Sequence, residues 1–270
     1  MREGGSRRLV LAAFSALCVA TFLTGCQISV STTINVSDNG SGSISVAATA
    51  DAETVRQAPE LGDSLRMDDL RAAGWDVDMQ NPAADGGISV VMRRNFANTE
   101  EATVLLSQLS GENGPLRNVQ LSRAGGVNDV TYVFRANGGL PSGLAGFADA
   151  DALEVLGAAP FQEALTRSGR ALPDALLLTV RLTTPGNVVE SNGEIVPRAS
   201  DDPSSTISWS VPVDGADVVL STTTRDRNVA AMIASYVARG LLVLLIVLAA
   251  GGVLYLATVV QRRSGTTPSS

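Results

Sequence analysis

Two long apolar runs lie at the two ends of this 270-residue chain, and they constrain its fold more than any other feature. One run covers residues 9–22 and follows Arg2, Arg7 and Arg8; the other covers residues 240–260 and contains no charged side chain. A helix of about 20 apolar residues matches the roughly 30 Å hydrocarbon layer of a membrane, and a soluble core seldom needs one. The two ends are therefore interpreted separately from the mixed sequence between them.

The first run is too short to span a bilayer and ends in Leu23-Thr24-Gly25-Cys26. Small residues followed by a cysteine at this point resemble the bacterial lipobox. The resemblance implies that residues 1–25 are a lipoprotein signal peptide, that cleavage falls between Gly25 and Cys26, and that the Cys26 thiol carries a diacylglyceryl group. A plain secretory signal with an incidental cysteine, or a retained anchor, remains the alternative. Cys18 would leave with the signal, so the processed chain would form no internal disulfide.

The second run predicts a transmembrane helix over residues 228–261, with its apolar core at 240–260, followed by a short cytoplasmic tail at 262–270. If Cys26 is processed outside the cell, a single later span places the C-terminus in the cytoplasm. Arg262 and Arg263 then agree with the excess of positive charge on that side, although Arg225, Arg227 and Arg239 reduce the asymmetry. The prediction is a cell-membrane protein, lipid-anchored and single-pass, with an extracytoplasmic domain at residues 26–227.

Composition removes several kinds of chemistry. The chain contains neither histidine nor lysine, so all 20 positive charges are arginines. A Ser-His-Asp triad, a histidine-ligated metal and a lysine Schiff base are therefore excluded. The formal net charge of −7 argues against a nucleic-acid partner, which would require a clustered basic surface. No cofactor or metal is expected.

Alternation of apolar and polar residues predicts about nine or ten strands between the two apolar runs. Helices are expected at 51–57, at 63–73 and after Asn98, and a glycine-rich loop is expected at 137–146. The fold class is therefore α+β: an antiparallel sheet with helices packed on one face, an arrangement of helix-grip type that leaves room for a lipid cavity. The strands are expected at 28–36, 43–47, 75–79, 88–96, 119–122, 127–135, 175–183, within 185–193, at 206–211 and at 218–223.

The third helix has a defined start. Asn98 and Glu101 form a capping box, in which Asn98 accepts from the Glu101 amide and Glu101 reaches back. This helix is expected to bury Val104, Leu105 and Leu109.

Together these features resemble the LppM family of actinobacterial envelope lipoproteins. The most specific part is Pro185-Gly186-Asn187-Val188, followed by Asn192-Gly193 and a strand centred on Trp209; the lipobox, the Asn39-Gly40-Ser41-Gly42 hairpin and the C-terminal span agree with it. The resemblance would cover roughly residues 26–260. It implies a membrane-tethered domain with a lipid-binding cavity of helices and sheet, proposed to bind glycolipids such as phosphatidylinositol mannosides, and it brings no catalytic motif.

Anionic head groups favour arginine at the rim of an apolar cavity. The candidate ligand-binding residues are Arg93, Arg94, Arg135 and Arg181; the alternative is that each is a solvated residue on a strand face. Trp75 and Trp209 are interpreted as core residues.

Enzymatic interpretations need carboxylates, and each candidate has a simpler explanation. Glu100 and Glu101 fit helix capping, and Asp76 and Asp78 fit a solvated strand face. Asp149, Asp151 and Glu154 lack the glycine and the remaining ligands of a calcium loop. A non-enzymatic protein that binds membrane lipid or glycolipid is therefore predicted. A structural or interaction protein of the envelope, with a membrane protein partner and no cavity, is the alternative.

The lipobox gives the first test. Replacing Cys26 with serine should abolish incorporation of radiolabelled palmitate, because serine lacks the thiol that accepts the diacylglyceryl group. Cys18→Ser should leave incorporation unchanged. Equal labelling of the Cys26→Ser variant and the wild type would contradict the assignment.

Overall fold

The computed structural model describes residues 27–57, 67–111, 113–126, 128–147, 165–166, 169–198 and 203–227, with 237–238, 241–242 and 245. The chain divides into two compact units, residues 1–124 with 131–225 and residues 125–130 with 226–270. No helix within the described ranges is both long and apolar enough to cross a membrane. Cys26, the predicted signal peptide and most of the predicted membrane segment lie outside the described residues.

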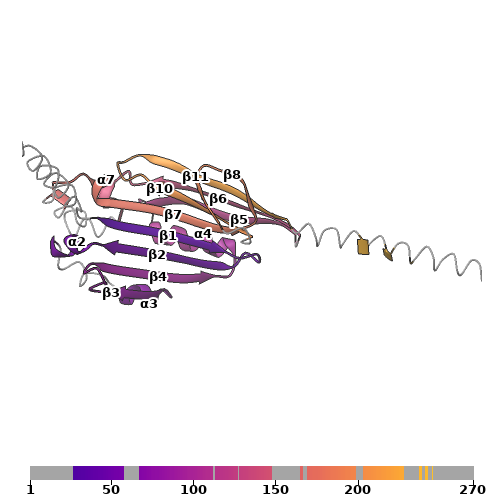
Figure 1. Ribbon diagram of the computed structural model, residues 1–270, viewed down its shortest axis with the longest axis horizontal. Helices are drawn as coiled ribbons and strands as arrows, with labels where there is room; N and C mark the ends of the chain where they lie inside the picture. The colour runs from indigo at the N-terminus through magenta and orange to yellow at the C-terminus, as the bar shows by residue number, and fades with distance from the viewer. Residues whose placement is uncertain are drawn as a thin grey trace, which may run out of the picture. The chain divides into compact units, whose positions relative to one another are not determined.

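The larger of two sheets has seven strands in the order β3-β4-β2-β1-β7-β10-β9 (Figure 1). β1 and β2 form the predicted hairpin around Asn39, whose side-chain oxygen accepts from the Ser41 amide at 3.0 Å. Gly40 follows with a φ of 85°, a conformation that glycine adopts without strain. The strands are β1 (Ile28–Val36), β2 (Gly42–Ala50), β3 (Asp76–Gln80), β4 (Ile88–Phe96), β7 (Leu176–Pro185), β9 (Glu194–Val196) and β10 (Ser204–Val211).

β1 and β7 pair in parallel, with Ile28 opposite Leu176, whereas the other pairs recorded in this sheet are antiparallel. The predicted antiparallel pairing is confirmed for those strands and is wrong for β1 with β7. Strand periodicity identifies the buried side of each strand but not its neighbour, and these two strands are far apart in sequence. The predicted strand at 175–183 is confirmed by β7, in which the alternate residues Leu176, Leu178 and Leu182 are buried.

A second sheet contains four strands in the order β5-β6-β11-β8, so the prediction of a single sheet is also wrong. Its strands are β5 (Leu116–Gly126), β6 (Asp129–Gly139), β8 (Asn187–Ser191) and β11 (Asp217–Arg227). The Phe134 ring on β6 lies 5.6 Å from the Trp209 ring on β10, and the Thr184 and Thr224 hydroxyls are 2.8 Å apart. The two sheets therefore pack face to face, because each has one apolar side to bury.

The chain crosses from one sheet to the other at Asn192 and Gly193, between β8 and β9. The Asn192 side-chain oxygen accepts from Trp209 Nε1 and from the Ser221 amide, each at 2.9 Å. Gly193 lies so close to the indole that an added Cβ would stand 2.5 Å from Trp209 Nε1. The Asn192-Gly193 pair, which contributed to the family resemblance, thus holds the crossing segment against Trp209 and β11.

Within the part of the chain that the structure describes, the helices are short except for α4. They are α2 (Ala52–Gln57), α3 (Met67–Ala72), α4 (Thr99–Ser110) and α7 (Leu172–Ala175), with a 3₁₀ turn η2 at Gly143–Phe147. The predicted loop at 137–146 is only partly correct, because residues 137–139 belong to β6.

Asn98 caps α4 as predicted, accepting from the Glu101 amide at 2.8 Å. Glu101 in turn accepts from the Ala97 amide at 2.7 Å, one residue before the expected partner. Leu105 is buried as predicted, but Val104 is 53% exposed, so that prediction is wrong. One helical position later, Leu106 faces the core instead.

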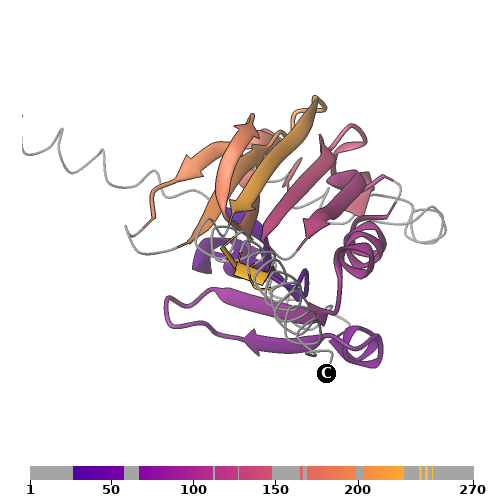
Figure 2. The same cartoon turned by 90° about the vertical axis from the view of Figure 1, so that its right-hand side faces the viewer.

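α4 also covers an edge of the smaller sheet, as the view in Figure 2 shows from the side. The Thr103 hydroxyl accepts from the Leu121 amide at 3.0 Å and lies 3.2 Å from the Leu121 carbonyl oxygen, to which it can donate. Because β5 is the edge strand, these backbone groups have no strand partner there. The helix therefore satisfies part of an edge that would otherwise pair with another chain.

The crossing point supplies a stability test. Gly193→Ala should lower the free energy of unfolding by about 1–3 kcal/mol, because the methyl group overlaps Trp209 and Ile207. Gly126→Ala is the matched control, since a methyl group there meets nothing within 4 Å. Urea unfolding followed by tryptophan fluorescence measures both, and equal midpoints for the two variants would contradict the packing described.

Candidate functional site

The inner side of the larger sheet is not uniformly buried. Ile34, Ile44 and Leu182 on this side are at most 1% exposed. Four other inward positions in the middle of β1, β2 and β4 are only half-buried: Val30, Thr32, Ala48 and Met92. We call these four residues the inner-face patch.

The strand register places the members of the patch in two neighbouring rows across β1, β2 and β4, with the buried Val46 and Val90 among them. Val30 pairs with Ala48, and Val46 lies between Thr32 on one neighbouring strand and Met92 on the other. Buried residues bracket the patch along the strands, with Ala50 and Ile88 toward one end and Ile34, Ile44 and Phe96 toward the other. Ile28 at the start of β1 is also half-buried, so the accessible surface extends from the strand centres to that end of β1.

The reason lies in the unequal size of the two sheets. Seven strands face four, so the smaller sheet by itself cannot cover the whole inner side of the larger one, and α4 contacts β4 beside the smaller sheet. The strands β1, β2 and β4, which carry the patch, belong to the half of the larger sheet remote from β9. Inward apolar side chains that keep accessible surface are the kind of lining that small-molecule sites use.

Arg94 shares this inner side. It pairs with Ile44 and lies two positions after Met92 on β4, so its side chain projects in the same direction. Arg94 Nη1 donates to the Ala73 carbonyl at 2.5 Å, just after α3. This contact fixes the guanidinium at the end of the helix and uses one of its five N–H groups.

The other three predicted arginines lie elsewhere. Arg93 and Arg181 are exposed on the outward side of the larger sheet, and Arg135 is exposed on the outward side of the smaller one. Arg93 and Arg181 belong to one row across the strands, because Arg93 pairs with Ser45, Ser45 with Thr33, and Thr33 with Arg181. Of the four candidates, the structure places Arg94 alone beside the patch.

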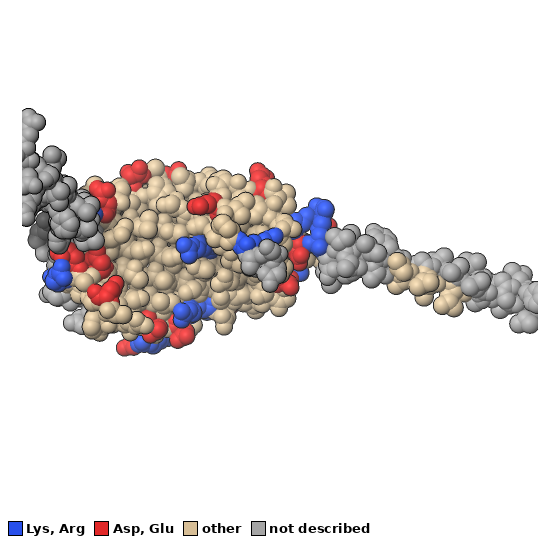
Figure 3. Space-filling view, viewed as in Figure 1, with Lys and Arg blue, Asp and Glu red and all other residues tan. Residues whose placement is uncertain are grey.

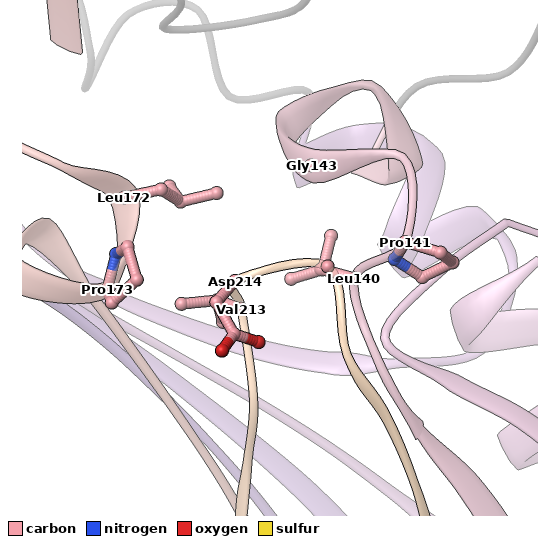
Figure 4. A pocket seen from close by; sticks show the side chains of 8 residues that line it. Leu140, Pro141, Gly143, Leu172, Pro173, Val213 and Asp214 are labelled. Atoms are coloured by element: carbon pink, nitrogen blue, oxygen red, sulfur yellow. The ribbon is translucent and has the colours of Figure 1, made fainter.

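A second feature is a depression of about 380 Å³ at one end of the sheets (Figure 4). Its apolar walls come from three separate parts of the chain, Leu140 after β6, Leu172 on α7 and Val213 after β10. Asp214 is the charged residue of the lining, and its carboxylate accepts from the Ala216 amide at 3.0 Å. None of the four predicted arginines lines this depression.

Asp51 holds Gln27, the residue just before β1, in place. The Asp51 carboxylate accepts from the Gln27 amide at 2.9 Å and from the Thr54 amide at 2.7 Å. Burial acts to raise the pKa of Asp51, but these hydrogen bonds and the nearby Arg170 outweigh it, so the pKa lies below its usual value of 3.8. The charged form of Asp51 therefore stabilises the point where the chain enters the domain.

The carboxylates considered for catalysis lie on an exposed strand face or at a helix cap. Asp76 and Asp78 are exposed on edge strand β3, and Glu101 is engaged in capping. Within the described ranges, no group of three or more cysteine or acidic side chains is arranged to hold a metal ion. Asp149, Asp151 and Glu154 lie outside the described residues.

Sequence reasoning anticipated parts of this arrangement. The predicted strand at 28–36 is confirmed, and both tryptophans are buried as predicted. Sequence patterns did not predict the inner-face patch, because the lack of cover over these residues depends on how many strands the opposing sheet contains. The depression was missed as well, since its walls come from residues far apart in the chain.

These observations define a mixed α+β domain, mostly sheet, with two packed sheets, few helices and a partly accessible inner side. No family model and no curated protein matches the chain. Among solved structures, the NMR structure of the folded domain of LppM from Mycobacterium tuberculosis matches at 16% identity and a TM-score of 0.39. The match covers 77% of this chain and 95% of that one.

The Asp51 contacts predict a pH-dependent stability. Because its folded-state pKa is depressed, Asp51 stabilises the fold fully above pH 3.8 and loses this effect as the pH falls through its folded pKa. Asp51→Asn should therefore be less stable than the wild type at pH 7, with a difference that shrinks below about pH 4. Unfolding midpoints between pH 2 and 7 measure this, with Asp78→Asn on the exposed face of β3 as the control. A difference that is constant over that range would refute it.

Proposed function

We propose that this protein is a non-enzymatic envelope lipoprotein whose extracytoplasmic domain binds a membrane lipid or glycolipid. In this proposal the Cys26 acyl chains and the helix at 240–260 hold the domain at the cell membrane. The observation that carries it is the inner-face patch, in which Val30, Ala48 and Met92 face inward yet keep accessible surface.

An acyl chain suits this surface for a physical reason. Each methylene moved from water to apolar surroundings contributes about 0.8 kcal/mol, so an uncovered apolar surface inside a domain favours an apolar ligand. Met92 adds a flexible side chain that adapts to chains of different length. A ligand with an acyl chain would complete the packing that the four-stranded sheet leaves unfinished.

Arg94 suggests where a head group would lie. Its guanidinium is on the same side of β4 as Met92 and keeps N–H donors beyond the one bonded to Ala73. Arginine recognises phosphate through paired N–H groups. An anionic lipid with its chain on the patch and its phosphate toward Arg94 is the ligand class that these residues support, and phosphatidylinositol glycolipids belong to it.

The composition supports binding in preference to catalysis. With no histidine or lysine in the chain, catalysis would depend on carboxylates or hydroxyls without the usual activating base. Among the carboxylates described above, Asp51 and Glu101 accept from backbone amides, and Asp76 and Asp78 lie together on the solvent-exposed face of edge strand β3.

One observation favours the alternative of an interaction protein. Val189, Ile195 and Val219 are between 56% and 64% exposed and lie on the three strands next to Asn192. Exposed apolar side chains that cluster on a folded surface often mark a protein contact. The two functions use different surfaces, so one experiment on the patch separates them.

Ala47 and Ala48 provide a matched pair, because adjacent residues on β2 project to opposite sides. Ala48→Phe places a large ring on the patch and should reduce binding of phosphatidylinositol at least tenfold. Ala47→Phe places the same ring on the outward side and should leave binding within twofold of the wild type. Native mass spectrometry of the full chain in detergent, titrated with phosphatidylinositol, measures both.

Thermal unfolding of the two variants shows whether each has folded. Loss of binding in both variants, or in neither, would contradict a site on the inner side. A wild-type chain that binds no phosphatidylinositol would contradict this ligand class and favour the interaction protein.

A further inference from the structure

The outward side of the larger sheet has an unusual charge distribution. The chain contains 27 acidic residues, yet none occupies an outward position on β4, β2, β1, β7 or β10. Arg93 and Arg181 are the charged residues there. We call the outward side of these five strands the outward face; it appears as a broad, largely uncharged surface in Figure 3.

Serine and threonine fill most of the remaining positions on this face. Their hydroxyls donate and accept hydrogen bonds, and their short side chains leave the surface even. Figure 3 shows the acidic side chains gathered mainly around the margin of this view. The outward hydroxyl residues are Ser29, Ser31, Thr33, Ser43, Ser45, Thr49, Ser89, Thr179, Thr183, Ser204, Thr206, Ser208 and Ser210.

The two arginines are set apart on this face. They lie in one row with Ser45 and Thr33 between them, which places their strands three spacings, or about 14 Å, apart. Asp76 and Glu194 end the same row on the edge strands β3 and β9. Arg93, on the outermost strand of the face, lies directly opposite Asp76, whereas Ser208 separates Arg181 from Glu194.

The outward side of the smaller sheet differs. It carries both signs, with Arg135 on β6, Glu190 on β8 and Asp217 on β11, and Asp217 pairs with Arg117. On the larger sheet the outward carboxylates, Asp76 and Asp78 on β3 and Glu194 on β9, lie on the two edge strands, whereas Asp217 lies on the interior strand β11 of the smaller sheet. An anionic surface would therefore meet carboxylates only at the margins of the outward face.

Strand directions add a geometric constraint. β1 begins at Ile28 and runs for nine residues, or about 30 Å. β7 is parallel to β1, β10 is antiparallel to β7, and β11 turns back from β10. The chain therefore enters at one end of the strands, at Ile28, and β11 reaches Arg225 at the opposite end. If both ends are tethered to one bilayer, the strands lie along the membrane and a side of the domain faces it.

We propose that the outward face of the larger sheet rests on a layer of anionic, hydroxyl-bearing lipid head groups. This inference rests on the proposed double tether but concerns a different surface from the proposed ligand site. Arg93 and Arg181 contact phosphates, and the serine and threonine hydroxyls bond to head-group hydroxyls between them. The tethers keep the local concentration of head groups high, so each contact can be weak.

A fluorescence-quenching experiment tests the orientation. The processed full chain is placed in nanodiscs of phosphatidylcholine and phosphatidylinositol that contain a nitroxide-labelled head group. Ser45→Cys supplies a thiol for a fluorophore between the two arginines, and Val133→Cys supplies one on the outward side of the smaller sheet. Quenching should be at least threefold stronger at position 45 than at position 133.

The arginines provide the second comparison. Arg93→Gln with Arg181→Gln should remove most of the difference between the two label positions, whereas Arg135→Gln should preserve it. Nanodiscs of phosphatidylcholine alone should also reduce the difference. An unchanged difference in neutral lipid would overturn the assignment to anionic head groups.

The outcomes separate this inference from the proposed function. Equal quenching at the two positions, or stronger quenching at 133, in a chain that stays with the nanodisc would overturn the inference and leave the double tether standing. Release of the chain from the nanodisc by alkaline carbonate would overturn both.

Discussion

The packing of a four-stranded sheet against a seven-stranded one is the constraint from which the other features of this domain follow. Two sheets with apolar inner sides must bury them together, and here contacts such as Phe134 on Trp209 and Thr184 with Thr224 join the layers. At the corner between β8 and β9, Asn192 bonds to Trp209 in one layer and to the backbone of β11 in the other. A short segment thereby sets the relative position of both sheets.

The inequality of the two sheets has a functional consequence. The inner side of β1, β2 and β4 keeps accessible apolar surface at Val30, Ala48 and Met92, with Arg94 on the same side. A domain optimised only for stability would fill this region, because uncovered apolar surface contributes nothing to folding. Proteins commonly retain such surface where a ligand supplies the missing contacts. The outward side of the same sheet has the opposite character, with hydroxyls and two separated arginines, so one sheet presents two chemically different surfaces.

Local sequence patterns predicted much of the secondary structure. Period-two alternation located β1, β4, β7, β10 and β11, and the Asn39-Gly40 pair located the first turn. The cap at Asn98 was also predictable, because it depends on residues within one helical turn. Val104 was predicted wrongly because the buried side of α4 depends on what the helix packs against, and Leu106 takes that place.

By itself, the sequence determined which segments are strands, which side of most of them is apolar, and that histidine and lysine chemistry is absent. These properties depend on neighbours along the chain or on composition alone. Only the tertiary structure decided that β1 pairs in parallel with β7, that the strands divide into two sheets, and that Arg94 separates from Arg93 and Arg181. Pairing between distant strands is set by the combined packing of the whole domain, and adjacent residues on one strand project to opposite sides. For that reason, four arginines that looked equivalent in the sequence occupy three different surfaces in the fold.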